Sequence, residues 1–239
     1  MDNYRKRADF ANYSGNAGAA YHEAKHGGGE FYDKIVARSR SQKFQPFVKE
    51  TDVVLEYGVG TGYNLVGIRC HEKVGYDVAE ACRAKVESKG IYFTSDIQEV
   101  LEWQSRFDVV ICHHALEHVP NPQMDLSRIR QVLKPTGRIL LCVPFEKGRR
   151  YRRFAPGDPD MHLFSWKTQT ICNLLLLTSY EICSAKIRPF GYERALAPLA
   201  KLGFWCYKAG LWIARIARPV PDEIFVVAMV AQVQKEDAR

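Results

Sequence analysis

The stretch from Val53 to Gly62 constrains the fold of this chain more than any other segment. Three apolar residues, 53 to 55, run into Glu56, and glycines then recur at alternate positions, 58, 60 and 62. An amphipathic run follows from Tyr63 to Cys70. Glycine tolerates positive φ and lets a ligand approach the backbone, so this pattern predicts a buried strand, a tight turn and a helix beginning at about Tyr63.

Strand and helix patterns alternate downstream of this turn. Strand patterns cover 74–77, 91–94, 108–112 and 138–143, and helix patterns cover 79–88, 97–103 and 123–133. Such alternation predicts an α/β fold with a mostly parallel sheet and right-handed crossovers. Ligands of these sheets bind beyond the carboxyl ends of the strands, so we expect the glycine turn and the polar residues that end the later strands to share one rim.

Two acids end the next two strand patterns. Asp77 lies 21 positions after Glu56, at the end of the second strand. A carboxylate there is placed to accept hydrogen bonds from both hydroxyls of a ribose. Ser95 and Asp96 end the third strand, where the edge of an adenine can be read.

The order of these motifs resembles that of the class I S-adenosylmethionine-dependent methyltransferases. The resemblance rests on E-x-G-x-G-x-G at 56–62, the strand-end acid at 77, Ser-Asp at 95–96, the run F-D-V-V-I-C-H-H-A-L-E-H-V at 107–119, and L-K-P-T-G at 133–137, which is similar to the family's L-K-P-G-G. It extends without interruption from about Asp52 to Pro144.

The resemblance implies a Rossmann-like, doubly wound sheet of seven strands, mostly parallel, with an antiparallel last strand. It divides the chain into a cap or lid segment, 1–50, and a methyltransferase domain, 51–239. It also implies S-adenosylmethionine as the cofactor and S-adenosylhomocysteine as the product. The implied cofactor contacts are Glu56, Gly58 and Gly60 for the methionine moiety, Asp77 for the ribose, and Val78, Asp96 and Ile97 for the adenine, with Tyr57, Asn64 and His113 also beside the cofactor.

The cap segment combines a polar, glycine-rich section, 13–29, with a helix pattern from Glu30 to about Phe47. Since such a segment often folds over the cofactor in this family, Tyr13, Tyr21 and His26 are candidate cofactor contacts. A packing helix with a mobile arm is the alternative.

A zinc-binding pattern, H-E-x-x-H, occurs at 22–26 of the cap. The three glycines at 27–29 would fray any helix that carried it, so we expect no metal there.

The segment 113–118, H-H-A-L-E-H, contains the inverted zinc motif H-x-x-E-H. The resemblance places it in the loop after the fourth strand, so we expect His113 near the cofactor and no metal. Glu117 and His118 are expected either to position the loop or to lie on the substrate side. His162 begins H-x-F-S, an element that related methyltransferases place near the acceptor, and Ser165 is a suitable N-cap for a helix over 166–177. His118 and His162 are therefore candidate catalytic bases, with a structural role as the alternative for His162.

The end of the chain predicts two antiparallel strands, 181–187 and 223–233, separated by a helical insertion at about 188–222. Basic residues recur in it at intervals of seven, at Arg194, Lys201, Lys208 and Arg215. This spacing predicts one basic stripe on a helix, with a break near Pro198 or Gly210. A Trp-rich helix of this kind favours either peripheral membrane contact through 194–218 or packing against the core as a lid or dimer helix.

Composition adds three expectations for this chain of 239 residues. The net charge of +7 is concentrated in 147–153 and 186–218, which indicates an anionic partner. The seven cysteines form no C-x-x-C pair and predict reduced thiols. Neither a secretory signal nor an apolar run of membrane-spanning length is evident, so we expect a cytoplasmic protein, peripheral to the membrane at most.

These observations predict an S-adenosylmethionine-dependent enzyme that O-methylates a small hydroxylated acceptor, sugar- or lipid-linked and anionic. An RNA or protein methyltransferase that uses the basic loop 147–153 is the alternative. Nucleic acid is disfavoured, since neither N-P-P-Y after the fifth strand nor a Pro-Cys nucleophile is present. A zinc-dependent hydrolase and a non-catalytic binding protein with the same fold complete the alternatives.

Overall fold

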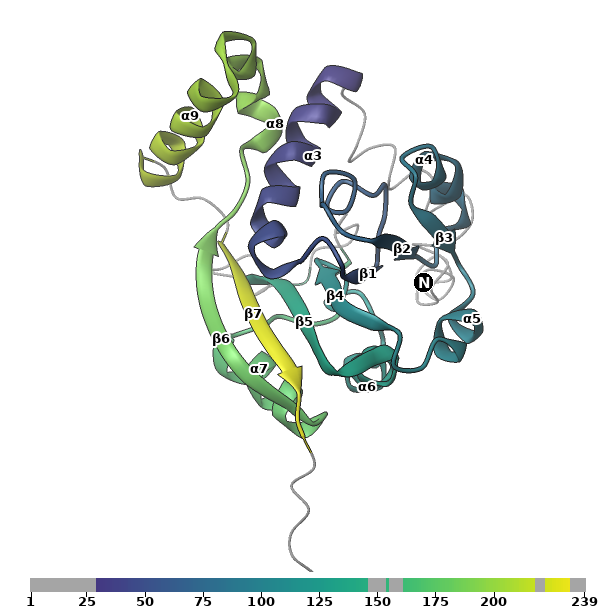
Figure 1. The fold of residues 1–239 in the computed structure, drawn as a ribbon. Coiled ribbons are helices and arrows are strands. Elements are labelled where there is room, and N and C mark those ends of the chain that lie inside the picture. The colour runs from purple at the N-terminus through teal and green to yellow at the C-terminus, as the bar shows by residue number, and fades with distance from the viewer. Residues whose placement is uncertain (1–28, 146–153, 155–160, 218–221, 233–239) are drawn as a thin grey trace, which may run out of the picture.

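The computed structural model describes residues 29–145, 154, 161–217 and 222–232 of the chain (Figure 1). The strands are β1 Val53–Tyr57, β2 Glu72–Tyr76, β3 Tyr92–Thr94, β4 Phe107–His113, β5 Leu133–Phe145, β6 Tyr180–Pro189 and β7 Asp222–Val230. The α-helices are α3 Glu30–Phe44, α4 Arg83–Glu87, α5 Ile97–Glu102, α6 Pro122–Val132, α7 Thr168–Leu177, α8 Glu193–Leu196 and α9 Phe204–Ala217. Short 3-10 helices are η2 Gln45–Phe47, η3 Glu80–Cys82 and η4 Ala197–Leu202.

The strands form one seven-stranded sheet in the order β3-β2-β1-β4-β5-β7-β6. Neighbouring strands from β3 to β5 pair in parallel, and β7 lies antiparallel between β5 and β6. The predicted doubly wound, Rossmann-like sheet with an antiparallel last strand is therefore confirmed. Because β1 to β5 all run the same way, their carboxyl ends share one edge of the sheet.

Helices cover both faces of the sheet, and the side chains of β4 alternate between them. Val110 joins a core with Leu126 of α6 and Ile171 of α7, whereas Ile111 joins a core with Phe44 of α3 on the opposite face. A parallel strand buried on both faces is mostly apolar, which explains the apolar run from Val109 to Cys112 in β4.

The helix expected from Tyr63 to Cys70 does not form. This segment is a series of turns, held to α3 by Ser41. The Ser41 hydroxyl donates to the carbonyl oxygen of Asn64 at 3.1 Å and accepts from the backbone N–H of Gly67 at 3.1 Å. In a helix, the carbonyl oxygen of Asn64 would accept from a backbone N–H four residues later, but here it accepts from Ser41. Tertiary packing therefore overrides the local amphipathic pattern.

The helix expected over 166–177 begins later, at Thr168, and its N-cap is Lys167 rather than Ser165. Trp166 instead forms a parallel bridge with Phe145 at the end of β5. An extended residue in a bridge cannot also occupy the first turn of a helix, so α7 starts after it.

The insertion is helical, as expected, but it is not one continuous helix. It divides into α8, η4 and α9. One break falls beside Pro198, as predicted, where α8 ends at Leu196 and η4 begins, and a second falls at Gly203, whose φ of 129° favours glycine. The four basic residues seven apart therefore lie on three elements rather than on one helix, so the prediction of one helical stripe is wrong. Two of them turn toward carboxylates: Arg194 pairs with Asp33 of α3, and Arg215 pairs with Glu193 of α8.

Several expectations concern residues outside the described part of the chain. These residues are Tyr13, Tyr21, the histidines at 22 and 26, and the basic loop 147–153. The helix expected from Glu30 to about Phe47 forms as α3 and η2. Among the described residues, no helix combines the length and apolar character needed to cross a lipid bilayer.

Candidate functional site

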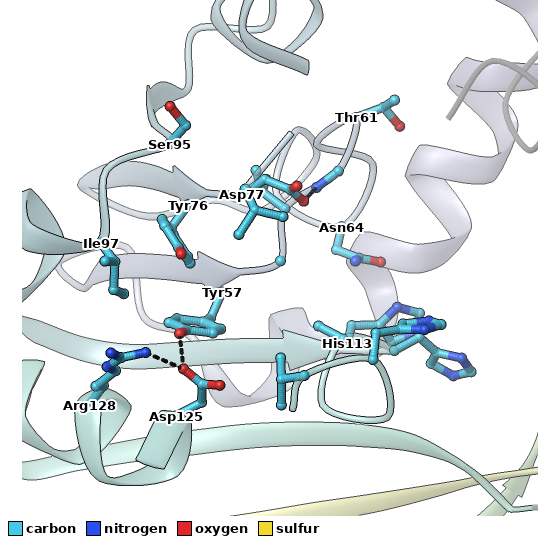
Figure 2. Close-up of a pocket in the computed structure, with 18 of the residues that line it drawn as sticks. Tyr57, Thr61, Asn64, Tyr76, Asp77, Ser95, Ile97, His113, Asp125 and Arg128 are labelled. Carbon is cyan, nitrogen blue, oxygen red and sulfur yellow. Dashed lines mark hydrogen bonds and ion pairs between the residues drawn. The ribbon is translucent and has the colours of Figure 1, made fainter. Parts of the chain in front are cut away.

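A cavity of about 770 Å³ opens at the carboxyl edge of the sheet. Its wall comes from the glycine turn after β1, the residues that follow β2 and β3, the loop after β4 and the first turns of α6. Arg40 of α3 and Phe190, just beyond β6, complete it. Figure 2 shows labelled side chains from these elements pointing into the same space. The strand ends thus converge on one cavity, as their order along the chain predicted.

Glycine is required at the turn after β1 for both conformation and space. Gly58 has a φ of 82°, and a Cβ built there would lie 2.5 Å from the Cβ of Ala115 in the loop after β4. The carboxylate of Asp77 holds the turn, because it accepts from the backbone N–H of Gly60 at 2.7 Å and of Ala79 at 2.9 Å. A carboxylate has about four acceptor positions, so an acid at this place can both shape the turn and accept from hydroxyls of a ligand.

Glu56 and Asn64 place two buried acceptors beside this turn. The amide of Asn64 donates to Oε1 of Glu56, while Glu56 Oε2 and Asn64 Oδ1 have no hydrogen-bond partner among the described residues. Burial raises the pKa of Glu56 to about 8, partly offset by the Asn64 hydrogen bond. Two orphaned acceptors around one carboxyl group fit an ammonium group, which offers three donors and no acceptor.

Arg40 supplies the opposite charge at the same end of the cavity, and the sequence did not single it out. It lines the wall, its Nε has no hydrogen-bond partner among the described residues, and its charge acts on the buried carboxyl of Glu56. A guanidinium is suited to a carboxylate, so Arg40 with Glu56 and Asn64 matches the zwitterion of an amino acid. Its position on the cavity side of α3 follows from the docking of that helix, which no local motif signals.

The other end of the cavity is lined by Val78, Ser95 and Ile97. Asp96 is not among the lining residues, since its carboxylate caps α5 by accepting from the backbone N–H of Gln98 at 2.8 Å. The apolar side chains of Val78 and Ile97 suit a flat aromatic ring such as adenine.

A buried polar network beneath this end was also missed from the sequence. The Tyr57 hydroxyl donates to Asp125 at 2.6 Å, Arg128 donates to the same oxygen at 3.0 Å, and Tyr76 packs on Tyr57 with ring centroids 4.8 Å apart (Figure 2). Burial and the neighbouring Asp125 raise the pKa of Tyr57. The spacing of Asp125 and Arg128 by three residues on a helix was the available signal.

His113 and His114 lie at the end of β4, in a buried cluster with Lys43 of α3 and Glu223 of β7. The Lys43 ammonium lies 2.7 and 2.8 Å from the two oxygens of Glu223 and 3.0 Å from Nε2 of His113. Burial and Lys43 lower the pKa of His113, and burial lowers that of His114. Burial alone would raise the pKa of Glu223, but hydrogen bonds from the two histidines and the charge of Lys43 hold it well below the usual value. Both histidines line the cavity, and the tilted rings of Phe190 and His114 have centroids 4.6 Å apart.

His118 and His162 come together although they are 44 positions apart in the sequence. Their ring centroids lie 4.9 Å apart, and His118 lines the cavity. The buried carboxylate of Glu117 lies 3.9 Å from Nε2 of His118. A backbone hydrogen bond of 2.8 Å from the N–H of Leu163 to the carbonyl oxygen of Glu117 holds the His162 segment against the loop.

Two groups of three metal-ligating side chains occur within the described part of the chain: His113, Cys142 and Glu223, and Glu117, His118 and His162. In the motif H-x-x-E-H, His114 lies 3.3 Å from Glu223 through Nε2 and 3.7 Å from Glu117 through Nδ1, whereas His118 packs against His162. In the first group the Lys43 ammonium already supplies the positive charge that a metal would bring.

A family model described as "Methyltransferase domain" matches residues 29–184. This segment holds the glycine turn, both strand-end acids and the histidine loop. The chain belongs to the methyltransferase domain family. It is a class I S-adenosylmethionine-dependent methyltransferase, and S-adenosylmethionine is its cofactor.

This methyltransferase is similar to two curated proteins over part of their length. It is 31% identical over 122 residues to a probable methyltransferase, ltbC, of Aspergillus luteorubrus, covering 42% of this chain and 43% of that one. It is 30% identical over 95 residues to the ubiquinone biosynthesis O-methyltransferase of Coxiella burnetii, covering 36% of this chain and 41% of that one. The chain thus spans less than half the length of these relatives.

The fold is similar to that of the Burkholderia thailandensis 1,6-didemethyltoxoflavin-N1-methyltransferase, solved with 1,6-didemethyltoxoflavin and S-adenosylhomocysteine bound. The TM-score is 0.60 at 19% identity, covering 97% of this chain and 90% of that one. The residues present fit the cofactor, because the amino-acid end of S-adenosylmethionine has the ammonium and carboxylate that Glu56, Asn64 and Arg40 suit, and its ribose has the hydroxyls that Asp77 can accept.

Proposed function

We propose that this methyltransferase methylates a hydroxyl oxygen of a small acceptor, and that His118 or His162 takes the acceptor's proton. The observation that carries the proposal is the cluster of Glu117, His118 and His162 at the cavity wall. A curated relative is named as an O-methyltransferase, which supports a hydroxyl as the acceptor.

The cofactor, when bound, supplies an electrophilic methyl group on a sulfonium. A neutral hydroxyl is a weak nucleophile, so a base that removes its proton as the methyl group is transferred increases the rate. An imidazole is suited to this step near neutral pH. In this proposal the buried Glu117 carboxylate stabilises the imidazolium that forms on His118, and His162 lies against that ring.

The proposed acceptor is anionic and sugar- or lipid-linked. Support comes from the five basic residues of 147–153, which come soon after β5 in the sequence, and β5 ends at the edge where the cavity opens. Peripheral membrane contact through 194–218 is proposed separately from the acceptor. An RNA or protein acceptor would use 147–153 as well, and salt-dependent binding of RNA would favour that alternative.

Separate variants His118→Ala and His162→Ala test the base. Formation of S-adenosylhomocysteine is followed with a panel of hydroxylated acceptors and their amine analogues, including lipid-linked sugars. We expect kcat to fall by about 10²–10⁴-fold in the variant that lacks the base, and its acidic pH limb to disappear, with cofactor affinity unchanged. Met124→Leu, which changes another cavity-lining residue at nearly constant volume, is the matched control. Full turnover in both histidine variants would exclude both as bases, and preference for amines would exclude O-methylation.

A further inference from the structure

Five large apolar side chains of the insertion are exposed, one at the end of η4 and four on α9. They are Leu202 at 77% exposed, Trp205 at 76%, Trp212 at 67%, Ile213 at 57% and Ile216 at 67%. We call this set the α9 apolar face. Trp205, Trp212 and Ile216 are seven and then four residues apart, so they lie along one side of α9.

The opposite side of α9 already has its partners. Tyr207 and Leu211 are buried, Arg38 of α3 lies 3.8 Å from the ring centre of Phe204, and Arg215 donates to Glu193 of α8 at 2.9 Å. In Figure 1, α9 lies at the periphery of the domain, beyond α3 and α8. The helix is therefore docked through its other face, and the described residues leave the α9 apolar face open to solvent.

The charges around this face are positive. The sequence from 194 to 221 holds five basic residues and no aspartate or glutamate. Lys201 and Lys208 are exposed beside the apolar face, and in the described part of the chain they contact neutral groups: Lys201 lies over the ring of Phe31, and Lys208 donates to Gln42. Their charge is thus available to an anionic partner.

We propose that the α9 apolar face docks on an anionic lipid surface. Tryptophan and isoleucine side chains enter the boundary between headgroups and acyl chains, and the flanking lysines meet the acidic headgroups. A second copy of this chain fits less well, because a two-fold contact through this face would set Lys201 and Lys208 against their own copies. Tryptophan side chains are enriched at the boundary between membrane and water. A convex helix face rich in tryptophan therefore suits a lipid surface better than a peptide, which would need a groove.

Docking on lipid would bring the cavity to the headgroups. The insertion leaves β6 at the carboxyl edge of the sheet, through Phe190, which lines the cavity. Arg215 of α9 lies 3.5 Å from the carbonyl oxygen of Gly191, the next residue. The lipid contact itself rests on the α9 apolar face and holds whether or not the proposed lipid-linked acceptor is correct.

Co-sedimentation of the full chain with vesicles tests this proposal. We expect binding to vesicles of phosphatidylcholine with phosphatidylglycerol, much weaker binding to phosphatidylcholine alone, and a blue shift of tryptophan emission on binding. The double variant Trp205→Glu/Trp212→Glu should lose binding. The variants Lys201→Gln and Lys208→Gln should each weaken it by roughly fivefold. Leu177→Glu, at a leucine 68% exposed on α7, is the matched control and should bind like wild type.

Two results would overturn the lipid proposal. One is equal vesicle binding by wild type and the tryptophan double variant. The other is absence of vesicle binding together with self-association, in native mass spectrometry, that the double variant abolishes. S-adenosylmethionine binding and turnover of a water-soluble acceptor should be unchanged in every variant, so failure of lipid docking is distinguishable from failure of the proposed methylation.

Discussion

At the scale of single residues, we propose that the carboxyl group of Glu56 couples cofactor binding to a proton. Glu56 is buried and bonded to the cavity-lining Asn64, but it is not itself among the lining residues. Its pKa of about 8 means that most of it is protonated at pH 7, although a carboxylate binds the cofactor's ammonium better. The complex therefore favours the ionised carboxylate, and binding at pH 7 must release a proton. An α-amino group itself loses its proton near pH 8, so the affinity is highest near that pH.

Calorimetric titration with S-adenosylmethionine at pH 7, in two buffers of different ionisation enthalpy, measures that proton. We expect release of about one proton per cofactor bound, and an affinity that rises from pH 6 toward pH 8. Glu56→Gln, which keeps the shape and cannot ionise, should bind more weakly and without proton release. Equal proton release by this variant would contradict the assignment.

Residues whose roles depend on local chain geometry were predictable, and those that depend on helix docking were not. The glycine turn and Asp77 could be identified because strand ends and their spacing are written in consecutive residues. Arg40 reaches the cavity only because α3 packs across the edge of the sheet. For Asp96, capping a helix competes with binding a ligand. Its carboxylate accepts from the backbone N–H of Gln98 and so caps α5 instead of facing the cavity.

At the scale of elements, the ion pair between Lys43 and Glu223 joins α3 to β7 beside the cavity. Its side chains are 17% and 2% exposed. Removing one partner leaves the other charge buried, which typically costs about 3–5 kcal/mol. The pair thus fixes the helix that carries Arg40 against the strand that pairs with β5.

Chemical denaturation of Lys43→Met, Glu223→Gln and the double variant tests this link. We expect each single variant to lower the free energy of unfolding by several kcal/mol, and the double variant by less than the sum, because it leaves no lone charge. The exposed pair of Glu30 and Lys34 is the control, and Lys34→Met should change stability by less than about 1 kcal/mol. Additive losses in the double variant would show that the two side chains are not coupled.

Element types followed from sequence periodicity, and the errors arose where tertiary contacts compete with it. The turns after Tyr63 form because Ser41 binds their backbone, and α7 starts late because Trp166 bridges to Phe145. The seven-residue basic repeat implied one basic stripe on a helix with a single break, but the insertion breaks both beside Pro198 and at Gly203, which takes a positive φ. Each error depended on a partner distant in the sequence or on one glycine.

At the scale of the whole molecule, the parallel strands bring two sets of residues to the carboxyl edge of the sheet. One set is proposed to bind the cofactor and the other to bind the acceptor. The end that suits an amino acid lies by Asn64 and Arg40, the end that suits an aromatic ring lies by Ile97, and His118 belongs to the same wall. The insertion leaves the sheet at this edge too, and it begins beside Phe190, which lines the cavity.

Calorimetric titration of metal-stripped protein with S-adenosylmethionine tests the central claim, that this cavity holds the cofactor. We expect micromolar affinity, on the order of −8 kcal/mol, that falls at least tenfold in Asp77→Ala. Asp77 also holds the glycine turn, so the thermal unfolding of Asp77→Ala is measured as well, to show that the variant is still folded. Asp52→Ala, which likewise loses a bond to a backbone N–H but at the far end of β1, should bind as wild type does. A folded wild-type protein that binds no S-adenosylmethionine would contradict the account.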